Sequence, residues 1–88
     1  MSWRIEVKPN AEKQYLKLDA ATRRRVKHAL RELEDAERPL FHPRMGSLTG
    51  RLKGDYRLRV GAWRILMTPD REARILHVYA ILPRGDAY

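Results

Sequence analysis

Leu48-Thr49-Gly50-Arg51-Leu52-Lys53-Gly54-Asp55-Tyr56-Arg57-Leu58-Arg59-Val60-Gly61-Ala62-Trp63-Arg64 is the stretch that decides the fold. In its second half apolar residues and arginines alternate, a Gly61-Ala62 turn follows, and a second strand pattern then opens. Neighbouring side chains on a strand point to opposite faces, so Arg57 and Arg59 share one face, and Arg64 can join them. Three guanidinium groups on one face repel one another unless an anion lies between them. A phosphate is the obvious candidate.

The residues before this hairpin predict one strand and two helices. Apolar residues alternate with charged ones over residues 3–8, which is typical of a half-buried strand. Pro9 suits the start of a helix, and Asp19 can cap a second helix that ends near residues 36–38. The apolar stripe of that second helix is Thr22, Val26, Ala29, Leu30 and Leu33.

The residues around and after the hairpin predict a loop and three strands. Residues 39–47 contain two prolines and a glycine, so we expect a loop there. The strands are expected at about 54–60, 63–68 and 73–82, with a turn at 69–72. The last strand is apolar on both faces, which is typical of a central strand. Its alternation places Leu76, Val78, Ala80 and Leu82 on one face.

The element order β-α-α-β-β-β predicts a single domain over residues 1–88 in the α+β class. A helical hairpin should cover one face of a small, mostly antiparallel sheet. The other face then remains open for a site.

Charge and composition narrow the class of protein. The net charge is +8, and residues 44–64 alone contribute +5 from six basic residues and one aspartate. Such a basic segment favours an anionic partner such as nucleic acid, although alternating arginines are also ordinary solubility residues. The chain has no cysteine and no apolar run of the roughly 20 residues that span a membrane. We therefore expect a soluble, cytoplasmic protein with no membrane association.

The chain offers few candidates for proton transfer. Tyr88 ends the sequence a few residues after Arg84, and nearby cations would lower the pKa of a phenol. His77 is a second acid/base candidate because it shares the predicted sheet with the arginines. The three histidines lack metal-ligand spacing, and no cofactor-binding motif is present. The sequence therefore predicts neither a metal ion nor a cofactor.

The element order, the hairpin segment from Leu48 and the ending Tyr79-Ala80-Ile81-Leu82-Pro83-Arg84-Gly85-Asp86-Ala87-Tyr88 together resemble the RelE/ParE toxin superfamily. The resemblance covers nearly the whole chain. It implies a type II toxin–antitoxin system and a RelE-like fold. RelE-type toxins cut mRNA in the ribosomal A site, without a metal ion, by attack of the RNA 2′-hydroxyl group.

Carried over by position, the resemblance implies a catalytic set that favours the RelE type. Its members are Arg57, Arg59, Arg64, Arg84 and Tyr88, with Arg51 and Lys53 as further RNA-binding residues. Arg64 is expected to be the main transition-state contact, and Tyr88 to activate the 2′-hydroxyl group or stack on a base. Well-described members have lysines where this chain has Arg57 and Arg59. Arginine stays protonated, so it can hold charge but hardly act as a base.

Two other functions stay open. ParE-type toxins share the fold but inhibit DNA gyrase without cutting RNA. A chain that has lost its activity could serve only as an antitoxin-binding corepressor. For an active toxin, the implied partners are the ribosome, mRNA and a cognate RelB-like antitoxin in a heteromeric complex. A +8 surface suits an acidic antitoxin.

Overall fold

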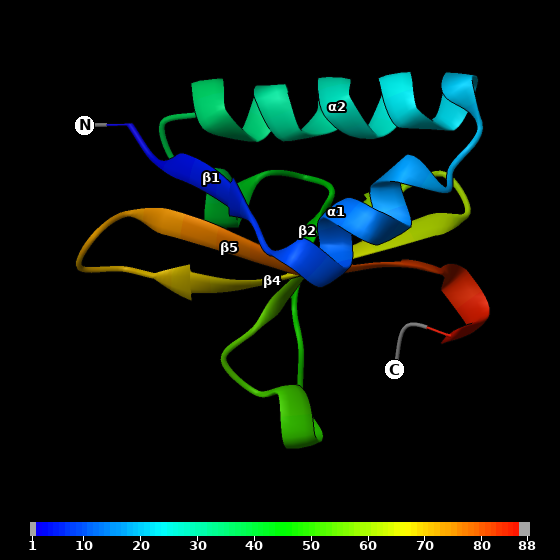
Figure 1. The fold of residues 1–88 in the computed structure, drawn as a ribbon. Coiled ribbons are helices and arrows are strands. Elements are labelled where there is room, and N and C mark those ends of the chain that lie inside the picture. Colours follow the sequence, from blue (N-terminus) through cyan, green and yellow to red (C-terminus); the bar gives the residue numbers. More distant parts are fainter. Residues whose placement is uncertain (1, 87–88) are drawn as a thin grey trace.

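The computed structural model describes residues 2–86 and contains one five-stranded sheet. The strand order is β1-β5-β4-β3-β2, and only β1 runs parallel to its neighbour. The bounds are β1 (Arg4–Val7), β2 (Met45–Ser47), β3 (Tyr56–Val60), β4 (Trp63–Asp70) and β5 (Ile75–Pro83). Helices α1 (Pro9–Leu16) and α2 (Ala20–Asp35) form a hairpin packed on one side of the sheet (Figure 1). The predicted α+β fold is confirmed.

The two helices form for the reasons that the sequence indicated. Pro9 occupies the first turn of α1, where its missing amide hydrogen costs no hydrogen bond. Asp19 caps α2, since its carboxylate accepts hydrogen bonds from the backbone amide and the hydroxyl of Thr22. These hydrogen bonds, first that of the Thr22 hydroxyl, lower the pKa of Asp19. Val26 and Leu33 in α2 are fully buried in the main core. Neither helix described in residues 2–86 is long and apolar enough to cross a membrane.

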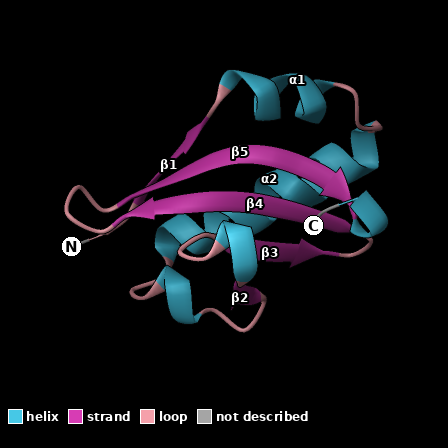
Figure 2. Cartoon of the chain, turned by 90° about the horizontal axis from the view of Figure 1, so that it is seen from below, coloured by secondary structure: helices cyan, strands magenta, loops and turns pink. Residues whose placement is uncertain are grey.

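The main core lies between the helices and the sheet. It also takes side chains from one face of the three long strands, namely Leu58, Val60, Ile65, Met67, Leu76, Val78 and Ile81. On the opposite face, which we call the open face, a smaller apolar cluster joins Leu66 and Ala80 to Leu48 and Leu52. Figure 2 looks onto this face, with α2 behind the strands. The 3₁₀ turn Gly50–Leu52 projects from this side of the sheet in Figure 1.

A β-bulge corrects the predicted face of the last strand. Leu66 pairs with Ala80 whereas Met67 pairs with Val78, so Tyr79 is an extra residue in β5. Because the extra residue reverses the alternation, Val78 packs in the main core but Ala80 packs on the open face. The prediction that Leu76, Val78, Ala80 and Leu82 share one face was therefore wrong.

Side chains of helix α1 form hydrogen bonds with the backbone of β5 beyond the end of β1. The pairing of β1 with β5 stops at Val78. Beyond it, the Asn10 side-chain amide donates to the Tyr79 carbonyl at 3.2 Å, and the Ile81 amide donates to the Gln14 side chain at 2.6 Å. The exposed edge thus finds partners without another strand.

Two connections differ from the prediction. Residues 39–47 are not only a loop, because Met45–Ser47 pairs with β3 as the short strand β2. Three residues are too few to show an alternating pattern. The turn after β4 lies at residues 71–74, since Pro69 still pairs within the sheet. The pairing of β3 stops at Met67, so Pro69 lies at a free edge, where proline is tolerated.

Candidate anion-binding site

The strand register brings the predicted arginines onto the open face. Arg59 pairs directly with Arg64, and Arg57 pairs with Leu66, whose side chain lies in the open-face cluster. Directly opposed residues share a face, so all three arginines point to the side away from the helices. This part of the prediction is confirmed for the backbone placement of Arg57, Arg59 and Arg64.

Arg64 is the least accessible of these arginines. Only 8% of its surface is exposed, and its Nη1 donates to the backbone carbonyls of Gly61 and Trp63, both at 2.9 Å. These bonds tie the guanidinium group to the turn between β3 and β4. Gly61 itself has φ of 59°, a left-handed conformation that glycine adopts without strain. Arg64 therefore stabilises the turn, whatever else it contacts.

Arg57 and Arg59 differ in their freedom. Arg57 is half-buried, its guanidinium group lies over Gly46, and its Nη1 donates to the Arg44 carbonyl at 3.4 Å. A Cβ on Gly46 would lie 2.8 Å from the Arg57 Cζ, so glycine leaves the room that this side chain uses. Arg59 is exposed. Its backbone amide also donates to the Arg44 carbonyl, at 3.1 Å.

The segment after β5 meets the same end of the sheet. Arg84 begins the 3₁₀ turn Arg84–Asp86, and its backbone amide donates to the Ala62 carbonyl at 2.8 Å. The exposed Arg84 is thereby fixed beside the turn that Arg64 holds. We call Arg59, Arg64 and Arg84 the cationic end of the open face. Tyr88 lies outside the described residues.

Arg51 and Lys53 lie apart from the cationic end. Both are exposed, in or next to the 3₁₀ turn Gly50–Leu52 that projects from the open face. Leu48 and Leu52 hold this segment against the apolar centre of that face. Among residues 2–86, the ion pairs involve Arg4, His28 and His77, but none of the predicted site arginines.

A second polar group occupies the other end of the open face, and His77 is the one member of it that was a candidate from the sequence. Asp55 accepts hydrogen bonds from the Thr68 hydroxyl at 2.9 Å and the Tyr79 hydroxyl at 2.8 Å. Burial, and then the hydrogen bond to Asp55, raise the pKa of Tyr79 well above its usual value. His77 pairs in register with Thr68 and with Glu6. We call Asp55, Thr68, His77 and Tyr79 the aspartate–tyrosine end.

His77 is too far from the cationic end to share a phosphate with it. His77 pairs with Thr68, which lies four positions from Arg64 along β4, or about 13 Å. The His77 Nδ1 is buried without a hydrogen-bond partner and lies 3.8 Å from the Glu6 carboxylate. In the described part of the chain, no group of three or more histidine or acidic side chains could hold a metal ion.

The sequence itself matches a known family over residues 5–88, described as the ParE toxin of type II toxin–antitoxin system, parDE. The chain belongs to the RelE/ParE toxin superfamily. Its fold agrees. The archaeal RelE in complex with RelB from Pyrococcus horikoshii has a TM-score of 0.78 and 24% identity, with 99% of this chain and 100% of that chain covered.

Other toxins of this superfamily have the same fold at lower identity. A mutant RelE from Escherichia coli in the free state has a TM-score of 0.74 and 21% identity, covering 99% of this chain and 87% of its own. The YoeB/ParE toxin from Agrobacterium tumefaciens has a TM-score of 0.74 and 14% identity, covering 91% and 96%. No curated protein sequence is significantly similar. The protein is a toxin of the type II toxin–antitoxin class. Which activity it has within that class must be argued from the arginines of the open face.

Proposed function

We propose that this toxin is a RelE-type, ribosome-dependent endoribonuclease that cuts mRNA in the A site. The observation that supports the proposal is the cationic end of the open face. Its three arginines come from β3, β4 and the turn after β5, and none forms an ion pair within residues 2–86. Guanidinium groups without an acidic partner are suited to an anion with several oxygens.

In this proposal the arginines act through charge. Attack of the RNA 2′-hydroxyl group on the adjacent phosphorus adds negative charge to the phosphoryl oxygens, and fixed guanidinium groups stabilise that charge. The exposed Arg59 and Arg84 would hold the scissile phosphate. Arg57 would hold the phosphate next to the scissile one. Arg64 would contact the transition state with the part of its guanidinium group that the turn does not use.

In this proposal Tyr88 accepts the proton of the attacking 2′-hydroxyl group. An arginine stays protonated and is a poor base. His77 lies beside Thr68, four positions or about 13 Å along β4 from Arg64, far beyond the roughly 3 Å that a direct proton transfer requires. The Tyr79 hydroxyl donates to Asp55, and its raised pKa makes it a poor base as well. Tyr88 therefore stays the proposed group for 2′-hydroxyl activation or base stacking.

A translating ribosome with a defined A-site codon tests the proposal. Added wild-type toxin should cut the mRNA within that codon and leave a 2′,3′-cyclic phosphate, with no metal ion added beyond the Mg²⁺ that the ribosome itself needs. The family description names ParE, so gyrase inhibition is the second candidate. Intact mRNA together with gyrase-dependent DNA breaks would establish that candidate and overturn the first. Action on ribosomes would also place the protein in the cytoplasm.

We also propose a RelB-like antitoxin as its partner. Similar structures from Pyrococcus horikoshii and Methanococcus jannaschii are RelE–RelB complexes, and the +8 charge of this chain suits an acidic partner. Co-expression with a short acidic protein from the neighbouring gene should abolish growth arrest and yield a heteromeric complex. Separate elution of the two proteins, with growth arrest unchanged, would count against that partner.

A further inference from the structure

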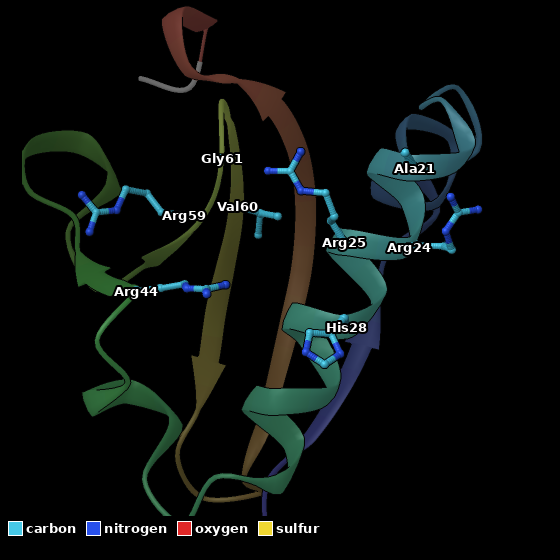
Figure 3. A pocket seen from close by; sticks show the side chains of 8 residues that line it. All are labelled: Ala21, Arg24, Arg25, His28, Arg44, Arg59, Val60 and Gly61. Carbon is cyan, nitrogen blue, oxygen red and sulfur yellow. The ribbon is translucent and has the colours of Figure 1, made fainter.

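A groove of about 770 Å³ lies between α2 and the edge of β3, and it shares Arg59 with the cationic end. Arg25 from α2 and Arg44 from the segment before β2 reach into it from opposite walls, with Val60 between them (Figure 3). Arg24 and Arg59 extend the basic surface outward on the two sides. The strand β2 pairs with β3 only as far as Leu58, so this edge is left uncovered.

The charge of the groove is of one sign. Four arginines and His28 line it, and no acidic residue of the described part of the chain does. Within residues 2–86, Arg25 and Arg44 form no ion pair, and their guanidinium groups donate none of the side-chain hydrogen bonds described. The Arg25 guanidinium group lies over Gly61, in the space that a Cβ would occupy. Like charges held this way are stabilised by a bound anion.

The lining favours a nucleic-acid backbone over a peptide. Within residues 2–86 its apolar side chains are Ala21 and Val60, so the groove lacks the apolar pockets into which an amphipathic helix would pack. The groove between α1, α2 and β1 is different, because Ile5, Val7, Tyr15, Leu16, Leu30 and Ile81 line it. A chain of phosphates needs charge rather than apolar pockets.

We infer that the groove between α2 and the β3 edge binds the phosphate backbone of single-stranded RNA next to the segment held at the cationic end. The inference rests on the proposed function, because it takes RNA as the substrate. Arg59 lies on the open face and also lines the groove, so one strand can pass from the site around the sheet edge. Arg25 and Arg44 anchor the RNA there and take no part in the chemistry.

Binding of a fully 2′-O-methylated oligoribonucleotide tests this inference, since that probe cannot be cut by 2′-hydroxyl attack. Affinity is measured from low to physiological salt for the wild type, Arg25→Ala/Arg44→Ala and the matched control Lys27→Ala/Arg31→Ala. Each phosphate contact to a single strand contributes about −0.7 to the slope of log K against log salt. In Arg25→Ala/Arg44→Ala, the groove variant, this slope should be less steep by about 1.4 because two phosphate contacts are lost. In the control the slope should equal that of the wild type. Circular dichroism melting curves verify that all three proteins are folded.

Three outcomes would overturn the inference. The first is a salt slope in the groove variant that is as steep as in the wild type, or a slope in the control that is reduced as much as in the groove variant. The second is an absence of measurable RNA binding by the wild type. The third concerns a glutamate hexadecapeptide. If the groove variant no longer binds this peptide but binds RNA as the wild type does, the groove is a protein-binding site. Cleavage on ribosomes is scored separately. A wild type that binds RNA through the groove but cuts no mRNA would overturn the proposed function alone.

Discussion

The two ends of the open face differ in the partners of their polar side chains. At the aspartate–tyrosine end, Asp55 accepts hydrogen bonds from Thr68 and Tyr79, so these side chains satisfy one another. At the cationic end, Arg64 is anchored on backbone carbonyls, and Arg59 and Arg84 have no acidic partner within residues 2–86. The same sheet presents both ends, separated by the apolar residues Leu66 and Ala80.

This difference shows where a ligand is needed. A polar group whose partners lie within the fold contributes to stability and has little left to offer a substrate. A set of like charges without partners is costly until an anion arrives. Substitutions at the two ends should therefore separate activity from stability.

The largest expected effect is on cleavage by Arg59→Ala/Arg84→Ala. Removal of a single donor that stabilises transition-state charge typically costs about 10²- to 10³-fold, so the double variant should lose at least about 10²-fold. Both side chains are exposed, so the melting temperature should stay close to that of the wild type. The measurement is the rate of A-site cleavage on programmed ribosomes. Arg31→Ala is the control, and a double variant that cuts as fast as this control would refute the assignment.

Arg64→Ala should affect both properties. Two charge-assisted hydrogen bonds to the turn are lost, and their loss should lower the free energy of unfolding by about 3 kcal/mol in urea titrations. Cleavage should also be lost if Arg64 contacts the transition state. Arg64→Lys separates the roles, because it keeps the charge with fewer donors. If growth arrest persists in the folded alanine variant, Arg64 has only the structural role.

The sequence predicted the fold well where patterns were long. The apolar stripe of α2, the Asp19 cap and the alternation around Arg57 and Arg59 all carried physical information over many residues. The bulge at Tyr79 carries no such signal, because an extra residue in a strand that is apolar on both faces leaves the pattern unchanged.

The candidate site was predicted in part, for a similar reason. Period two is enough to place three arginines on one face. The burial of Arg64 depends on the carbonyls of a turn, which no pattern reveals. Arg25 and Arg44 come together only because α2 passes over the β3 edge. In the sequence, Arg25 is the last of three consecutive arginines, a pattern that is common on the solvated face of a helix.

At the aspartate–tyrosine end, Asp55→Ala should lower stability and spare activity. The Thr68 and Tyr79 hydroxyls lose their acceptor, and for half-exposed groups the cost should be about 1.5 kcal/mol in urea titrations. Cleavage on ribosomes should stay within about twofold of the wild type. A cleavage defect much larger than the stability loss would mean that the aspartate–tyrosine end belongs to the site, and the contrast between the two ends would fail.

The smallest expected effect is the late titration of Tyr79. Burial and the hydrogen bond to Asp55 raise its pKa above the ordinary 10.0, so the folded protein keeps this proton where the unfolded chain releases it. The associated stability is fully present below about pH 10 and is lost as the pH rises through the folded pKa. Ultraviolet titration of tyrosinate should show a phase that ionises above pH 10, and Tyr79→Phe should remove that phase. In Asp55→Asn the hydroxyl loses its charged partner, so the phase should move to lower pH while burial still holds it above 10. If Tyr79 titrates near pH 10 instead, this end is open to solvent. The contrast between an end whose polar groups bond to one another and an end whose arginines need an anion would then be weaker.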